Sequence, residues 1–226
     1  MMSSDAKYYQ VAPRNSLAER LVIRARDRIF GDFMRLCGPA KIDTVLDVGV
    51  SDVVNDAANL IERKYPWPEQ ITAVGLGDLA AFRTAYPVVT TLRIDANRPL
   101  PVPDGAFSIA TSNAVLEHVG SHAAQIAFVR ELVRVARKVF ITVPNRFFPV
   151  EHHTAIPLMH FTDASFAGAC AALGKQEWAR SDNLILMSKR RLAALAPPHA
   201  RGSVGYTGIR LGPFSSNLFL FINHGR

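Results

Sequence analysis

The feature that most constrains the fold is an alternation of short apolar runs with amphipathic stretches between residues 44 and 143. Short apolar runs favour buried strands, and apolar residues at helical spacing favour helices that cover them. Strands that alternate with helices through short connections pair in parallel, and the helices cross over both faces of the sheet. The predicted strands are 44–48, 71–76, 88–94, 107–111 and 139–143, and the predicted helices are 53–61, 79–85, 115–118 and 123–138.

Two further segments flank this alternating core. Before it, the capping-box pattern Ser16-Leu17-Ala18-Glu19 predicts a helix that runs to Leu36 and stops at Gly38-Pro39. After it, residues 146–161 are rich in aromatic residues, proline and histidine. Next come a predicted helix from Thr162-Asp163 to Gly174, a short helix at 188–196, and an antiparallel hairpin of 204–211 and 218–222 around Gly212-Pro213.

The chain length favours one domain, because an α/β domain of 226 residues need not divide. We expect four parts within it. These are a helical lead-in at 1–40, a cofactor-binding core at 41–145, a substrate-side loop with helices at 146–200, and a C-terminal β-hairpin at 201–226.

Composition narrows the class of protein. No apolar run reaches 18 residues, and the N-terminus lacks a basic segment followed by an apolar one, so we expect no membrane span and a cytoplasmic location. Cys37 and Cys170 stand far apart without metal-ligand spacing, which predicts free thiols in a reducing compartment.

The net charge of +7 is compatible with an anionic substrate. The basic residues are scattered, which argues against a dedicated nucleic-acid protein, and the oligomeric state is left open.

Several of these passages together resemble a known family. The passages are VLDVGVSD, ITAVGLGD, LRIDANRPLPVPDGAFSIATSNAVLEHV and RELVRVARKVFITVPNRFFPVEHHT. They resemble the class I S-adenosylmethionine-dependent methyltransferases, in particular small-molecule enzymes with an "EH" pair after the fourth strand. The resemblance covers residues 41–154. It implies a Rossmann-like, doubly wound, mostly parallel seven-stranded sheet, with helices on both faces and the terminal hairpin supplying the last two strands.

The resemblance also implies a cofactor site at the carboxyl ends of the strands, where open α/β sheets bind ligands. Asp47 and Gly49 match the first motif of the family, which contacts the methionine part of S-adenosylmethionine; Ser51 stands where the family has a further glycine. Gly77 occupies the position of the acidic residue that holds the ribose, so either Asp78 replaces it or the contact is lost. Asp95 and Ala96 match the adenine contacts, and Asn113 matches the residues lining the methionine end. Glu117 and His118 match the "EH" pair.

The histidines suggest the chemistry on the acceptor side. Histidine titrates near neutrality and could serve as a base for a hydroxyl acceptor, so His153, His152 and His118 are the predicted catalytic residues, with His153 preferred. The spacing of Glu151, His152, His153 and His160 fits no recognised metal motif, so no metal site is expected. Phe147, Phe148 and Phe161 are predicted to wall the pocket.

We therefore expect methyl transfer from S-adenosylmethionine to a small or carrier-linked acceptor, with oxygen favoured over nitrogen; the product would be S-adenosylhomocysteine. Two alternatives differ in class. A nicotinamide dehydrogenase requires G-x-G-x-x-G after the first strand, and the sequence there, Gly49-Val50-Ser51-Asp52-Val53-Val54, lacks it. A non-catalytic interaction domain that kept the fold with a degenerate cofactor loop would explain the missing glycines.

Overall fold

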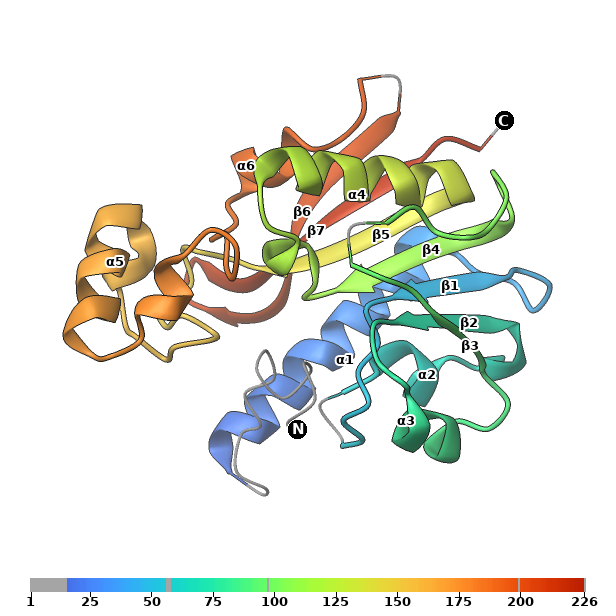
Figure 1. The fold of residues 1–226 in the computed structure, drawn as a ribbon, viewed down its shortest axis with the longest axis horizontal. Helices are drawn as coiled ribbons and strands as arrows, with labels where there is room; N and C mark the ends of the chain where they lie inside the picture. Colours follow the sequence, from blue (N-terminus) through green and yellow to red (C-terminus); the bar gives the residue numbers. More distant parts are fainter. Residues whose placement is uncertain (1–15, 56–57, 97, 199, 226) are drawn as a thin grey trace.

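A seven-stranded sheet forms the centre of the molecule in the computed structural model, in the order β3-β2-β1-β4-β5-β7-β6 (Figure 1). The structure describes residues 16–55, 58–96, 98–198 and 200–225, so the predicted lead-in at 1–15 lies outside the described residues. The strands are β1 Val45–Val48, β2 Ile71–Gly75, β3 Thr90–Arg93, β4 Phe107–Asn113, β5 Ala136–Pro144, β6 Arg201–Leu211 and β7 Phe214–Asn223.

The first five strands and β6 run in the same direction, and only β7 runs the other way. β1 lies between β2 and β4, with Asp47 level with Ala73 on one side and Thr111 on the other. β7 inserts antiparallel between β5 and β6, with Lys138 level with Asn223. The carboxyl ends of β1 to β5 therefore meet at one edge of the sheet. The predicted fold class is confirmed, including the antiparallel hairpin.

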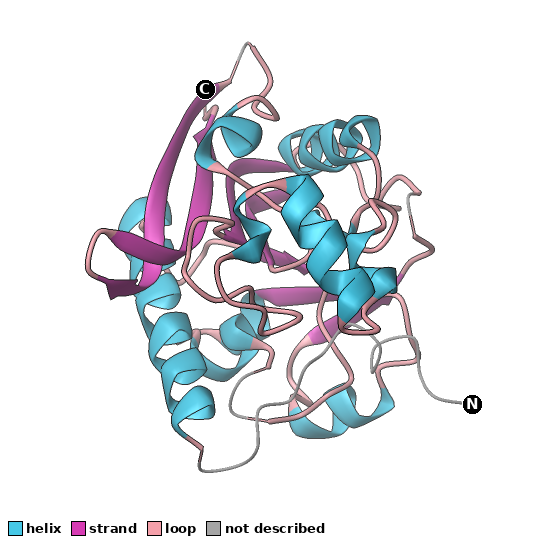
Figure 2. Ribbon diagram, turned by 90° about the vertical axis from the view of Figure 1, so that its left-hand side faces the viewer, coloured by secondary structure: helices cyan, strands magenta, loops and turns pink. Residues whose placement is uncertain are grey.

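Helices cover both faces of the sheet and enclose two apolar cores (Figures 1 and 2). One core contains buried residues of α4 and α6, such as Val129 and Leu192, against β4, β5 and β7. The other contains Phe33 of α1, Leu60 of α2 and Phe82 of α3. The helices are α1 Leu17–Cys37, α2 Leu60–Lys64, α3 Ala80–Ala85, α4 His122–Val135, α5 Asp163–Ala172 and α6 Lys189–Ala193. Four short 3₁₀ turns are η2 Pro68–Gln70, η3 Leu116–His118, η4 Met159–Phe161 and η5 Gln176–Ala179.

Side-chain caps fix the ends of the longer helices where the sequence places them. The Ser16 hydroxyl accepts from the backbone N–H of Glu19 (3.1 Å), and Gly38 ends α1 in the left-handed conformation. The Thr162 hydroxyl accepts from the Ser165 N–H (3.1 Å) and begins α5. These local signals predicted both helix starts correctly.

Three predicted helices are wrong in extent. The helix expected over 53–61 is mostly loop, and α2 begins only at Leu60, because Asn59 adopts a left-handed φ of 46° and bonds back to the loop. The helix expected to run to residue 138 ends at Val135, where β5 begins. In β5, residues 136–138 pair with β4, and Lys138 also pairs with β7, so pairing between distant segments overrides the helical period there. The helix at 188–196 is also shorter, as α6.

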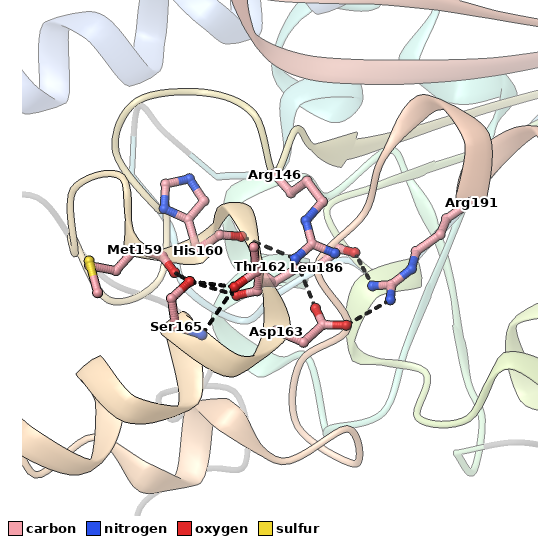
Figure 3. A network of polar contacts seen from close by, with 8 residues as sticks. All are labelled: Arg146, Met159, His160, Thr162, Asp163, Ser165, Leu186 and Arg191. Carbon is pink, nitrogen blue, oxygen red and sulfur yellow. Dashed lines mark hydrogen bonds and ion pairs between the residues drawn. The ribbon is translucent and has the colours of Figure 1, made fainter.

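Residues 146–186 fold over the carboxyl ends of β4 and β5, on the left of Figure 1. They have a small core of their own that includes Phe166 and Trp178. Buried Arg146 donates to the His160 carbonyl (3.2 Å) and to Asp163 (2.8 Å), and Asp163 also pairs with Arg191 (2.9 Å) (Figure 3). Because Arg146 follows β5 directly, this network ties the segment to the sheet.

Candidate functional site

Gly49, the first residue after β1, lies in close contact with the segment after β4. Its φ is +101°, and a Cβ placed on it would lie 2.2 Å from Cγ2 of Val115. Only glycine combines this conformation with this approach. Its N–H donates to the carbonyl of Val74 (2.8 Å). Gly49 therefore fixes the path of the chain as it leaves the sheet, a structural reason for the glycine that is independent of any ligand.

The loop after Gly49 is held together by Asn59, which sequence reasoning missed. The Asn59 side chain accepts from the Ser51 N–H (3.0 Å) and donates to the carbonyls of Ser51 (2.9 Å) and Val53 (3.2 Å). The Ser51 hydroxyl in turn accepts from the Val53 N–H (3.1 Å). This chain thus closes the loop with side-chain bonds where the family uses glycines.

Asp47 is buried in β1 beside Glu62 of α2, another residue that the sequence did not point to. Burial raises the pKa of Asp47, although Glu62 and Arg26 lower it in part. Burial and the charge of Asp47 raise the pKa of Glu62 well above its usual range. Two carboxyl groups in one apolar site do not both ionise readily, so this pair retains a proton towards neutral pH.

The two acidic residues expected to hold the adenosine part lie at the same edge and are exposed. Asp78 follows β2, and its carboxylate pairs with Arg83 (3.3 Å). Asp95 follows β3, and Ala96 beside it is also exposed. Gly77 is partly buried between β2 and Asp78. The parallel order β3-β2-β1 puts Asp47, Asp78 and Asp95 at successive strand ends along one edge.

Asn113 ends β4 and already has a protein partner. Its side-chain oxygen accepts from the hydroxyl of Thr142 on the neighbouring strand β5. The carboxamide is therefore oriented by the sheet before any ligand binds.

Glu117 and His118 lie on η3, next to the segment 146–186. Glu117 is 1% exposed, and burial raises its pKa to about 7. Nδ1 of His118 lies 2.7 Å from the Asn183 carbonyl, and its Nε2 lies 3.1 Å from Nε2 of His153. Burial lowers the pKa of His118 to about 4, aided by the charge of His153.

Glu151 and His153 form the second half of this cluster. The Glu151 carboxylate accepts four hydrogen bonds, from the N–H and Nδ1 of His153 and from the N–H and hydroxyl of Thr154 (2.6 to 2.9 Å). Burial opposes ionisation of Glu151, but these bonds outweigh it and lower its pKa to about 2. Burial likewise disfavours a charged His153, but Glu151 outweighs it and raises the pKa of the ring.

The other two histidines of this segment lie apart from the cluster. His152 is exposed, and its ring meets that of Phe148 edge-on at 5.7 Å. Nε2 of buried His160 bonds the Phe148 carbonyl (2.7 Å). A cavity of about 10 Å³ lies among Glu117, Glu151, His152, His153 and His160, with room for one water-sized species. The predicted phenylalanine wall is not part of its lining; Phe147 and Phe161 pack on each other instead.

The structure thus brings His118 and His153 together and leaves His152 at the surface. Asn59, Glu62 and Asn183 are the residues that sequence reasoning missed. Neither Asn59, a polar residue between apolar positions of the predicted helix 53–61, nor Glu62, just beyond that helix, carried a distinct signal. Asn183 contributes a backbone carbonyl, for which the sequence holds no signal.

Known proteins share this fold. The family described as "Methyltransferase domain" matches residues 46–139. A search of curated protein sequences found no relative. A protein of Pyrococcus horikoshii has the same fold with a TM-score of 0.61 and 14% identity, covering 97% of this chain and 99% of that one. A SAM-dependent methyltransferase of Aquifex aeolicus (TM-score 0.52, 14% identity, 92% and 93% covered) is also similar. So is a possible histamine N-methyltransferase of Thermotoga maritima (TM-score 0.54, 13% identity, 92% and 95% covered).

The solved structures are at most 14% identical to this chain and therefore support only its fold. The family match supports the class of protein. Residues 46–139 match a methyltransferase domain, and the cofactor indicated by that match is S-adenosylmethionine. The residues at the strand ends fit that ligand, because exposed carboxylates at Asp78 and Asp95 can accept from ribose hydroxyls and an adenine amino group. In the described part of the chain, none of the helices is long and apolar enough to cross a membrane.

Proposed function

We propose that this enzyme methylates a hydroxyl of a small or carrier-linked acceptor, and that the acceptor binds on the side of His118 and His153. The bound cofactor supplies an electrophilic methyl group for in-line displacement. The protein must then align the acceptor and take up its proton. The observation that carries the proposal is the pair of histidine Nε2 atoms 3.1 Å apart beyond the end of β4.

Both rings are held by their other nitrogen. Glu151 accepts from Nδ1 of His153 and the Asn183 carbonyl accepts from Nδ1 of His118, so when both rings are neutral their lone pairs belong to the two Nε2 atoms. A proton released by a hydroxyl would be accepted between the two Nε2 atoms. Amine acceptors that bind in neutral form need less help from such a base, which is why the cluster favours oxygen.

The cofactor side is proposed to use the exposed strand ends. Asp78 would release Arg83 and accept from the ribose, Asp95 and the Ala96 N–H would meet the adenine, and Asp47, Gly49, Ser51 and Asn113 would surround the methionine part. A cytoplasmic location and an acceptor other than nucleic acid stay predictions.

Calorimetric titration with S-adenosylmethionine tests the cofactor side. We expect Asp95→Ala and Asp78→Ala each to weaken binding about tenfold or more, because each removes a hydrogen bond to the ligand. Glu69→Ala, which changes an exposed carboxylate away from this edge, is the matched control. Unchanged affinity in both variants would move the adenosine site elsewhere. Failure of the unaltered protein to bind at millimolar ligand would favour the non-catalytic interaction domain.

The acceptor side is tested by methylation of a panel of hydroxyl and amine compounds with labelled cofactor. His153→Gln should lower kcat at least a hundredfold for hydroxyl acceptors while leaving cofactor affinity within about twofold. Equal losses for hydroxyl and amine acceptors would argue against a proton-accepting role. Full turnover in the variant would remove His153 from the mechanism.

A further inference from the structure

Three side chains from two separate segments converge beyond the end of β4. Glu117 and His118 come from η3, and His153 comes from the segment that folds over the sheet. One ligand atom from each of the three lies within 4.8 Å of the others. This group is distinct from the strand ends assigned to S-adenosylmethionine, and it combines two imidazoles with one carboxylate.

Both imidazoles are oriented by acceptors on their outer nitrogens. The Glu151 carboxylate lies 2.8 Å from Nδ1 of His153, and the Asn183 carbonyl lies 2.7 Å from Nδ1 of His118. Metal-binding histidines are characteristically held in this way, because a carboxylate or carbonyl on one nitrogen fixes the tautomer and directs the lone pair of the other at the ion. Here the two inner nitrogens, Nε2 of His118 and Nε2 of His153, lie 3.1 Å apart.

The third member, Glu117, has a buried carboxylate. It is 1% exposed, and neither of its carboxylate oxygens has a hydrogen-bond partner among the described residues. A buried carboxylate without partners is costly, and such groups are normally paired with a cation or coordinate a metal. The cavity of about 10 Å³ beside Glu117 and His153 has room for one water-sized species.

We propose that Glu117, His118 and His153 bind a divalent transition-metal ion, with Glu151 and the Asn183 carbonyl as outer partners. Two ligand atoms on a tetrahedral zinc ion, at about 2.0–2.1 Å each, lie roughly 3.4 Å apart. The two Nε2 atoms, at 3.1 Å, are already near that spacing. The Glu117 oxygen lies within 4.8 Å of both nitrogens, so it must approach by at most about 1.4 Å. Two imidazoles and one carboxylate suit zinc, manganese, iron or cobalt better than calcium or magnesium, which prefer oxygen ligands.

The proposal departs from the expectation of no metal. That expectation rested on the spacing of the two cysteines and of the histidines and glutamate between 151 and 160. The structure divides that group: His153 is a ligand, Glu151 supports it, and His160 bonds a backbone carbonyl. The inference rests on the proposed function for its chemical role: an ion held by both Nε2 atoms would bind the acceptor oxygen as a Lewis acid and favour loss of its proton to water, in place of direct proton uptake by the rings.

Metal binding itself provides the test and needs neither cofactor nor acceptor. The full chain is stripped with a chelator and titrated with Zn²⁺ by calorimetry, and with Co²⁺ by visible absorption, which reports coordination geometry. We expect one equivalent of either ion to bind. Glu117→Gln, which keeps the shape of the side chain, and His118→Gln should each weaken binding at least tenfold, and the Co²⁺ spectrum should change.

His122→Gln is the matched control, because His122 is an exposed histidine at the start of α4. Circular dichroism and thermal melting confirm that each variant is folded, and S-adenosylmethionine affinity is measured on the same samples. Loss of Zn²⁺ binding with intact cofactor binding in Glu117→Gln supports the site independently of the proposed reaction. No binding by the unaltered chain at micromolar ion, equal binding by Glu117→Gln and His118→Gln, or loss of binding only in His122→Gln would overturn it.

Discussion

The carboxyl ends of the parallel strands form two regions, one beyond β2 and β3 and one beyond β4 and β5. The polar residues of these two sides differ in burial. Beyond β2 and β3, the acidic residues assigned to the cofactor are exposed, and Asp78 has a single surface ion pair with Arg83. Beyond β4 and β5, the polar groups are buried, and Glu151 alone accepts four hydrogen bonds. One side offers exposed binding groups, whereas the other is a buried network in which the Glu151 carboxylate is fully engaged and the Glu117 carboxylate has no hydrogen-bond partner among the described residues.

This difference in burial means that residues on the β2–β3 side affect mainly ligand binding, whereas residues on the β4–β5 side also affect the stability of the fold. Exposed ion pairs contribute little to folding, so residues such as Asp78 are available for a ligand at small cost to the protein. Buried networks contribute strongly only when complete, so a change on the β4–β5 side disturbs the fold as well as the chemistry. We therefore expect substitutions on the two sides to give different ratios of lost stability to lost affinity.

The largest effect on stability is expected for Glu151→Ala. The change leaves the N–H and ring nitrogen of His153 and both donors of Thr154 without their buried acceptor, and it should cost about 3–5 kcal/mol of unfolding free energy. Urea denaturation measures this loss, with Glu177→Ala, an exposed glutamate on η5, as the control. A loss below about 1 kcal/mol would show that the network is not a stabilising unit, and the contrast between the two sides would fail.

A smaller loss of stability is expected at the contact between Gly49, which follows β1, and Val115, which follows β4. Gly49→Ala should cost about 2–4 kcal/mol, because alanine is strained at φ +101° and its Cβ would overlap Val115. Adding Val115→Ala should return part of this loss by removing the overlap and leave the backbone strain. Thermal or urea unfolding of the two single variants and the double variant gives the coupling. Strictly additive losses would mean that the two segments do not press on each other.

The smallest effect concerns the buried pair Asp47 and Glu62. Because the folded-state pKa values are raised, the native state binds more protons than the unfolded chain, so the pair lowers stability as pH rises from about 5 to 8. Glu62→Gln should remove much of this slope, by about 1–2 kcal/mol across the interval. Unfolding free energies at pH 5 and pH 8 measure it, and exposed Glu69→Gln should leave the slope unchanged. An unaltered slope in Glu62→Gln would show that the carboxyls titrate independently of folding.

The sheet and its order of elements could be predicted because they depend on local patterns. The apolar runs marked the five parallel strands, Ser16 and Thr162 marked the starts of α1 and α5, and Gly212-Pro213 marked the hairpin turn. The errors fall where distant contacts decide. The Asn59 side chain bonds back to its own loop, and pairing with β4 extends β5 to residue 136. Neither contact produces a periodic pattern in the sequence.

The candidate site was predictable only in part for the same reason. The family resemblance identified the strand-end residues, because each directly follows a recognisable strand. The meeting of His118 with His153 depends on how residues 146–186 fold over the sheet, and the part that carries His153, residues 146–161, has no helical or strand period to indicate it. Glu117 appeared in the sequence only as half of the "EH" pair, and its lack of a hydrogen-bond partner is visible only in the structure.

The insertion of β7 between β5 and β6 has a consequence for how the molecule is made. During synthesis, β5 leaves the ribosome long before the strand that will cover it, so its free backbone groups remain an open template for pairing with other chains. The same strand leads into Arg146 and the segment that carries His153. Correct assembly of the histidine cluster therefore waits on the last strand to arrive, and a nascent chain stalled before residue 214 should be prone to aggregate.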